Sequence, residues 1–232
     1  RADLKPEDHI RAQHALAQDF MRAGLFDRAE AAWRKLEGTA FDADARLALL
    51  TLYERSRDWA AATQVAEQLD RKDAAAFDIR IAHYECELAM EADARGEPEQ
   101  AEAALQRARA AAPTAARPLV LVGSRQWRSG EVERAMTTWE ELRRAQPASF
   151  NLVATDYARA AVASHQQVRA ISTLQDQYGR APSMALLRAW AVVDTDASAM
   201  RERLVKHLEA APAMSAAQAL MAEPPQAWGE SG

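Results

Sequence analysis

The sequence repeats itself with a period of about 34 residues, and this period restricts the possible folds more than any other feature. The stretch Gly96–Pro113 superposes on Gly130–Pro147 at a shift of 34 positions. Glycine, glutamate, alanine and proline recur at matching places, and Leu105 in the first stretch aligns with Trp139 in the second. A unit of this length cannot bury its apolar residues alone, so several copies must stack into an array.

The composition indicates that each repeat is helical. Alanine is abundant, glycine and proline are scarce at 8 and 9 residues of 232, and 27% of the residues are charged. This balance favours helix over sheet, and the period is that of the tetratricopeptide helix pair. We therefore predict an all-α fold, a right-handed tetratricopeptide-repeat (TPR) superhelical solenoid of about six antiparallel helix pairs.

One alanine recurs in the second helix of five predicted pairs, with spacings of 33, 39, 34 and 35 residues. A small side chain there lets the two helices of a pair approach closely, and a bulky residue four positions later fills the space beside it. The second repeat exchanges the two sizes, with Leu50 at the small position of its first helix and Ala66 at the bulky one. The predicted structural positions are Ala29, Trp33, Ala62, Gly96, Ala101, Leu105, Gly123, Gly130, Ala135, Trp139 and Ala170, with Ala17, Ala89 and Ala158 as further small residues of first helices.

The predicted array covers residues 7–222, and residues 223–232 are predicted to be a disordered tail. Proline and glycine mark most of the helix boundaries. The repeats lie near 10–42, 43–76, 82–115, 116–149 and 151–184, followed by a degenerate repeat at 183–212 and a capping helix at 213–222. The predicted helix pairs are 7–22 with 27–37, 43–55 with 58–70, 76–95 with 98–111, 114–128 with 131–145, 150–164 with 166–179, and 183–193 with 197–210.

Charge and cysteine content exclude several functions. A net charge of −5 leaves no basic surplus for nucleic acid. The single cysteine, Cys86, excludes an intrachain disulfide and a zinc site built from cysteines. The longest uncharged run has 13 residues, short of the roughly 20 that a membrane helix needs, so we expect no direct membrane contact. The chain opens at Arg1, and we read it as a fragment of a longer protein.

We find no pattern of catalytic residues and predict no enzyme. Phosphate-binding loops, nucleophile elbows and HExxH motifs are missing from the sequence. His83 and Cys86 lie three residues apart on one face of a predicted helix and could form half of a metal site. The remaining histidines fall in other repeats, so we assign this pair to packing and surface contact and predict no metal.

TPR solenoids bind partners along the surface that the first helices of the pairs share. Arginines beside apolar residues on this surface suit a protein partner with some acidic character. Trp127 either anchors such a partner or contacts the neighbouring repeat. The predicted binding residues are Arg11, His14, Gln18, His83, Cys86, Met90, Arg117, Ser124, Trp127 and Arg159, and the same surface also includes Met21, Asp44, Leu47, Thr51, Glu54, Asp93, Val120, Leu152, Thr155 and Val162.

The segments Ala23–Trp33 (AGLFDRAEAAW), Asp58–Leu69 (DWAAATQVAEQL) and Ile81–Met90 (IAHYECELAM) are more specific than the repeat pattern. In these segments, and in order from about Pro6 to Ala222, the chain closely resembles the lipopolysaccharide assembly protein B family of Gram-negative bacteria. The resemblance implies a non-catalytic adaptor that brings the lipid A pathway deacetylase to the membrane protease FtsH and so limits lipopolysaccharide output.

The resemblance also implies parts that this sequence lacks. Family members have an N-terminal membrane anchor and a C-terminal rubredoxin-like module that binds zinc through two CxxC pairs. We therefore expect no cofactor in this chain and zinc only in the missing module. The location implied for the parent protein is the cytoplasmic face of the inner membrane, while this fragment itself is expected to be soluble.

Two alternatives remain open. The chain could be the TPR array that precedes an N-acetylglucosaminyl transferase domain, in which case a nucleotide-sugar domain follows it. It could also be a generic solenoid that forms a homodimer through the exposed faces of its terminal helices.

Overall fold

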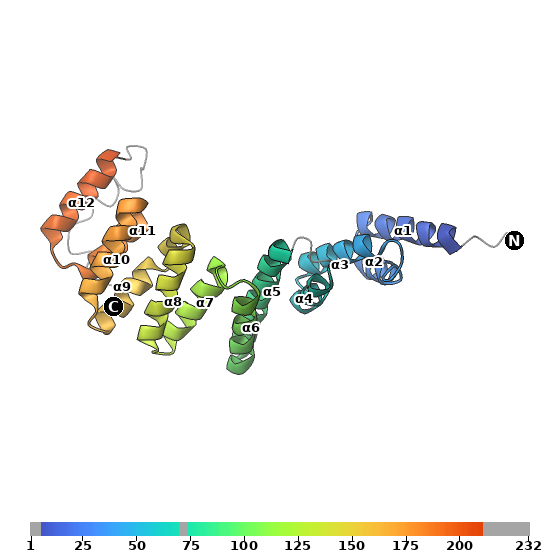
Figure 1. Cartoon of the computed structure of the whole chain (residues 1–232), viewed down its shortest axis with the longest axis horizontal. Helices are drawn as coiled ribbons and strands as arrows, with labels where there is room; N and C mark the ends of the chain where they lie inside the picture. Colours follow the sequence, from blue (N-terminus) through green and yellow to red (C-terminus); the bar gives the residue numbers. More distant parts are fainter. Residues whose placement is uncertain (1–5, 70–73, 211–232) are drawn as a thin grey trace. The chain divides into compact units, whose positions relative to one another are not determined.

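The computed structural model describes residues 6–69 and 74–210, and within these ranges every regular element is a helix (Figure 1). The predicted all-α fold is confirmed, and the helices follow one another in pairs of the TPR type. The predicted capping helix at 213–222 and the tail at 223–232 lie outside the described residues. No described helix is both long and apolar enough to cross a bilayer.

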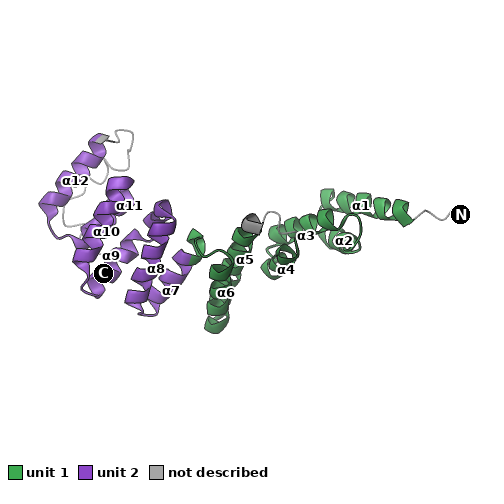
Figure 2. Cartoon of the chain, in the orientation of Figure 1, with its two compact units in different colours: residues 1–118 green, residues 119–232 purple. Residues whose placement is uncertain are grey.

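The chain divides into two compact units, residues 1–118 and 119–232 (Figure 2). We call the two helices of each pair its first and second helix. The second helices of unit 1 pack on their first helices in each pair. Unit 1 contains the pairs α1 (Pro6–Arg22) with α2 (Phe26–Arg34), α3 (Asp42–Ser56) with α4 (Trp59–Gln68), and α5 (Ala74–Arg95) with α6 (Pro98–Ala111).

Unit 2 begins inside α7 (Ala116–Arg128) and continues with α8 (Val132–Ala145). A 3₁₀ helix, η2 (Pro147–Leu152), precedes α9 (Ala154–Ala163), which pairs with α10 (Gln167–Arg180). The last pair is α11 (Met184–Val193) and α12 (Ala197–Ala210). The division of the chain into repeats and a single array over 7–222 stays a prediction.

The observed helices agree with the predicted ones within a few residues, except at the start of the fifth pair. We expected a helix from residue 150, but α9 begins only at Ala154. The preceding segment forms η2, with Pro147 in its first turn. Phe150 of η2 is fully buried with its ring 5.4 Å from that of Tyr157, and this contact fixes the tighter turn before the α-helix starts.

The turn inside each of the first five pairs contains one residue with a left-handed backbone. These residues have φ between 58° and 78° and lie five positions before the recurring alanine of the second helix. Glycine adopts this conformation without steric cost, whereas other residues do so rarely. Three of the five are glycines and two are not. The left-handed turn therefore recurs in the backbone even where the glycine does not recur in the sequence. They are Gly24, Arg57, Gly96, Gly130 and His165.

The recurring small residues lie in the core of both units. The five alanines of the second helices are completely buried, and the bulky residues four positions later are at most 4% exposed. Leu50 and Ala66, the exchanged pair of the second repeat, are both buried as well. A Cβ atom at Gly123 would overlap Nε1 of the Trp139 indole, so the indole occupies the space that this glycine leaves.

Candidate functional site

The first helices of unit 1 are joined across the predicted binding surface by contacts between polar and charged side chains. His14 on α1 lies 3.7 Å from the carboxylate of Asp44 on α3 (Nε2 to Oδ2). The same imidazole stacks on Phe41 at a centroid distance of 4.3 Å and meets Trp33 edge-on. The His14 side chain is therefore only 17% exposed, and packing holds it in place.

A second cluster joins α3 to α5 around the carboxylate of Glu54. Arg80 donates from Nη2 to Glu54 Oε1 at 2.7 Å, and the Tyr84 hydroxyl donates to the same oxygen. Burial and the hydrogen bond to Glu54 raise the pKa of Tyr84 to about 12. Helical spacing predicted that Glu54 lies on the binding surface, but it predicted neither Arg80 nor Tyr84 there. Their contacts with Glu54 depend on the distance between two helices that are separated in the sequence.

A third cluster joins α5 to the start of α7. Arg117 donates to Glu87, lies 3.3 Å from Nδ1 of His83 and contacts the sulfur of Met90. Burial and the nearby Arg117 guanidinium lower the pKa of His83. Arg117 was expected to face an acidic partner, but its charge is already met by Glu87. Met90 remains 47% exposed beside this pair.

Cys86 does not reach the predicted surface. Its side chain is completely buried, and burial raises the pKa of the thiol to about 12. The prediction that Cys86 lines the binding surface is therefore wrong, because the α5 face that carries it turns into the core. Residues 6–69 and 74–210 contain no group of three or more histidine, cysteine or acidic side chains placed to hold a metal ion.

Two predicted residues on α1 are more accessible. Arg11 is exposed, and Gln18 is half-buried with its amide nitrogen 3.4 Å from Nε2 of His14. On α3, Leu47 is 45% exposed. The surface of the first helices of unit 1 is thus mixed, with isolated apolar side chains between charged groups that already have partners.

The first helices of unit 2 present a different surface. Ser124 and Trp127 on α7 are half-buried, while Leu152 beside α9 and Val162 on α9 are 75% and 39% exposed. Arg159, which falls between these two residues in the sequence, pairs with Asp156 of its own helix at 3.4 Å. An exposed pair within one helix contributes little to stability, so the guanidinium can exchange partners at small cost.

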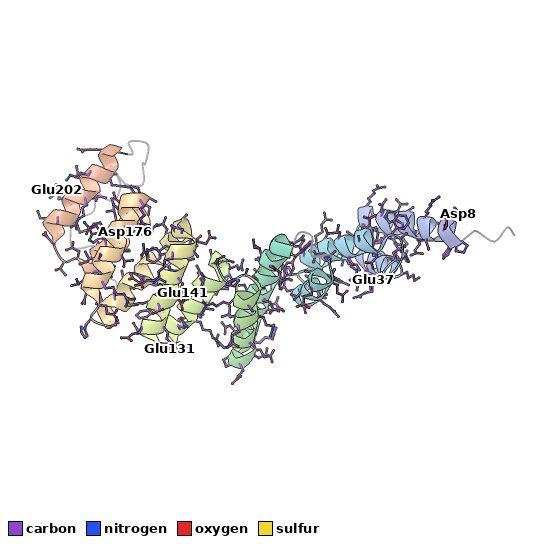
Figure 3. The ribbon with its side chains drawn as sticks, viewed as in Figure 1. Asp8, Glu37, Glu131, Glu141, Asp176 and Glu202 are labelled. Atoms are coloured by element: carbon purple, nitrogen blue, oxygen red, sulfur yellow. The ribbon has the colours of Figure 1, made fainter. Side chains whose placement is uncertain are left out.

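Two ion pairs of unit 2 join its second helices α8 and α10. Arg143 on α8 lies 2.9 Å from Asp176 on α10, which Figure 3 labels. Glu140 on α8 accepts from Arg169 on α10 at 2.7 Å and from the Tyr157 hydroxyl at 2.8 Å. Burial alone would raise the pKa of Glu140, but these two hydrogen bonds and the charges of Arg169 and Arg144 together outweigh it and lower the pKa.

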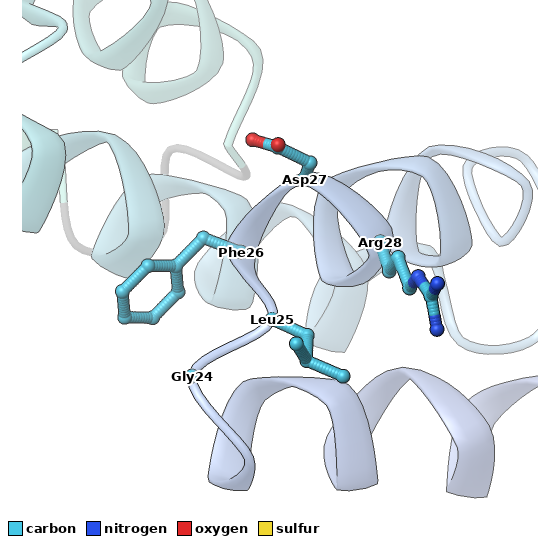
Figure 4. A pocket seen from close by; sticks show the side chains of 5 residues that line it. All are labelled: Gly24, Leu25, Phe26, Asp27 and Arg28. Atoms are coloured by element: carbon cyan, nitrogen blue, oxygen red, sulfur yellow. The ribbon is translucent and has the colours of Figure 1, made fainter.

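A shallow hollow of about 310 Å³ lies at the turn between α1 and α2. Leu25 and Phe26 at this turn are 44% and 41% exposed. The side chains of Leu25, Phe26, Asp27 and Arg28 point in different directions (Figure 4). Because a small-molecule site needs polar groups that converge on one point, this hollow does not form one.

Comparison with known proteins supports the family resemblance. No family model matches the chain. Over 142 residues the chain is 32% identical to lipopolysaccharide assembly protein B of Escherichia coli (strain K12). The chain is similar to lipopolysaccharide assembly protein B. The similarity extends to lipopolysaccharide assembly protein B of Haemophilus influenzae, with 29% identity over 150 residues.

The alignments cover 61% and 62% of this chain but only 36% and 38% of the two lipopolysaccharide assembly protein B sequences. The chain thus spans little more than a third of these relatives. Among solved structures, Pseudomonas aeruginosa pilF aligns with a TM-score of 0.45 at 20% identity, covering 95% of this chain and all of that chain.

Proposed function

We propose that this chain is the protein-binding part of an adaptor in lipopolysaccharide assembly, without catalytic activity of its own. The observation that carries the proposal is the 32% identity to lipopolysaccharide assembly protein B over 142 residues. The specific role that follows from the resemblance is to bind the lipid A pathway deacetylase and to present it to the membrane protease FtsH. Such a role requires no cofactor within the repeats and is consistent with the cytoplasmic face of the inner membrane.

The described surface supports a protein partner rather than a small molecule. Exposed apolar side chains such as Leu47 on α3 and Met90 on α5 lie on different first helices of unit 1 instead of lining one enclosed cavity. A partner must therefore extend over more than one helix to bury them. Side chains that lie on successive helices of an array offer such a partner a series of contacts.

The test is a binding experiment with purified components. The immobilised chain is exposed to the purified deacetylase, and the complex is then exposed to detergent-solubilised FtsH. We expect the chain to retain the deacetylase, and FtsH to be retained in a second step that leaves the deacetylase bound. Retention of neither protein at tens of micromolar would reject the proposed function, and retention of the deacetylase alone would reject the adaptor step.

A further inference from the structure

The first helices of the two units carry opposite charge. In unit 1, the helices α1, α3 and α5 together contain eleven acidic residues and six arginines. In unit 2, residues 119–128 of α7 together with α9 and α11 carry four arginines and one acidic residue, Asp156. This is a local basic excess in a chain whose net charge is −5. The four arginines are Arg125, Arg128, Arg159 and Arg188.

Apolar side chains are also exposed on α9, on α11 and at the end of η2, which precedes α9. Leu152, Val162 and Val192 are 75%, 39% and 37% exposed. On α11, Arg188 and Val192 are four residues apart and both exposed, so they share the helix side that faces away from the core. Because α9, α11 and η2 pack against one another, we call the exposed side chains that they carry, Leu152, Arg159, Val162, Arg188 and Val192, the basic face.

The charges on the basic face are available to a ligand. Arg159 has only the exposed contact with Asp156, and its side chain is 59% exposed. Arg188 is exposed and has no ion-pair partner in the part of the chain that the structure describes. By contrast, Arg143 and Arg169 on the second helices are engaged by Asp176 and Glu140. A carboxylate that binds Arg159 or Arg188 therefore does not have to break a buried ion pair.

We propose that the basic face binds an extended segment of a partner protein that carries both carboxylates and large apolar side chains. Charge complementarity selects the acidic groups, and Leu152, Val162 and Val192 supply the apolar contacts. Packed helices lie 8–10 Å apart and an extended chain advances about 3.3 Å per residue, so side chains three positions apart reach successive helices. This inference rests on the proposed role as a protein-binding scaffold and adds the binding surface and the class of ligand.

The test selects ligands without assuming their identity. A phage library of random 12-residue peptides is panned on the immobilised full chain, and the selected peptides are then synthesised with a fluorescent label. We expect them to be enriched in aspartate or glutamate together with leucine, phenylalanine or tryptophan. Their affinity should fall at least about tenfold for the double variant Arg159→Glu/Arg188→Glu and severalfold for Leu152→Ser.

A matched control separates the basic face from apolar exposure in general. Val168 on α10 is 84% exposed and lies on a second helix, so Val168→Ser should leave the affinity unchanged. Circular dichroism and the thermal midpoint confirm that each variant folds. Peptides without acidic enrichment, or equal affinity for the wild type and the arginine variant, would overturn the proposal.

Two further outcomes distinguish this surface from its alternatives. If the arginine variant abolishes a monomer–dimer equilibrium in sedimentation and leaves peptide affinity unchanged, a second copy of the chain occupies the face and the proposal fails. If the deacetylase binds the wild type and the arginine variant equally, the proposed function stands while the basic face is wrong. If selected peptides require the arginines but the deacetylase does not bind, the basic face stands and the proposed partner is wrong.

Discussion

Unit 1 and unit 2 are built from the same kind of helix pair, but prominent ion pairs between their helices join different helices in the two units. In unit 1, Arg80–Glu54 and Arg117–Glu87 join first helices. In unit 2, Arg143–Asp176 and Arg169–Glu140 join second helices. Where such pairs form, the charged side chains have partners within the chain itself. A repeat fold can therefore keep its packing and still change which of its surfaces has charge available for a partner.

The packing, in contrast, is the same in both units. Ala29 and Ala62 in unit 1 are as completely buried as Ala135 and Ala170 in unit 2. Burying apolar side chains contributes far more to stability than ion pairs near the surface do. We therefore expect core substitutions to have large effects in either unit, and substitutions in the ion pairs to have smaller effects that differ between the units.

The largest expected effect comes from removing a core indole. Trp139→Ala should lower the free energy of unfolding by about 3–5 kcal/mol, because the side chain is completely buried and leaves a large cavity. Urea unfolding followed by circular dichroism measures the loss. Hydrogen exchange then shows whether amide protection falls in α8–α10 alone. An equal loss of protection in α1–α4 would contradict the view that the two units are separate.

A smaller effect is expected from adding a single carbon atom at the same contact. Gly123→Ala places a Cβ atom against the Trp139 indole and should cost about 1–3 kcal/mol. Gly179 is the matched control, because it also lies in a helix of unit 2 but has open space around it. Gly179→Ala should stabilise the helix by about 0.5–1 kcal/mol. Thermal unfolding of the two variants should therefore shift in opposite directions.

These contacts show which parts of the fold can be predicted from sequence. The pairing of a small residue with a bulky residue four positions later in the second helix predicts that Ala135 and Trp139 are buried. The glycines at the turns Gly96 and Gly130 were predicted from their spacing. The equivalent turn residue His165 was not, because an imidazole side chain gives no signal for a left-handed backbone.

The binding surface was less predictable than the core. Helical spacing placed Arg117 and Arg159 on the first helices, but it could not show that Glu87 engages one of them while the other pairs only within its helix. Which partner a long charged side chain chooses depends on the distances between helices, and the repeat pattern does not specify these distances. The prediction for Cys86 was wrong for a related reason, since the sequence spacing alone did not show which residues of α5 turn into the core.

The contacts of the buried Glu140 carboxylate in unit 2 should be sensitive to acid. Glu140→Gln should cost about 1–3 kcal/mol at pH 7, because it removes the charge that Arg169 and Tyr157 engage. The pKa of Glu140 is lowered in the folded protein, so its stabilisation is complete above the ordinary glutamate value of about 4.3 and is lost as the pH falls through the lower folded value.

The measurement is a series of urea unfolding curves between pH 7 and pH 3. The wild type should lose more stability over this interval than Glu140→Gln does. Glu30, whose pKa is lowered chiefly by its hydrogen bond from Tyr53, is unchanged in both proteins and provides a common background. Parallel losses of stability in the two proteins would show that the ion pairs of unit 2 do not contribute as their geometry indicates.

The smallest effect is expected at the ion pair of unit 1. Glu87→Gln should cost only about 0.2–1 kcal/mol, because the Arg117 side chain is 42% exposed and water screens the pair. His83 provides a more sensitive measure. Glu87 favours the protonated imidazole and Arg117 opposes it, so removing the Glu87 charge should lower the pKa of His83 further. An NMR titration of His83 in the two proteins measures this change.

An unchanged or raised pKa of His83 in Glu87→Gln would mean that Arg117 leaves the imidazole when the Glu87 charge is removed, because the loss of the guanidinium then offsets the loss of the carboxylate. A cost in stability as large as that of Glu140→Gln would contradict the view that water screens this pair. A lowered pKa with a small loss of stability would show that Arg117 stays beside His83 and that Glu87 meets its charge with little gain in stability. The charged pair on these first helices of unit 1 then engages Arg117 without holding the fold together, in contrast to the contacts of Glu140 in unit 2.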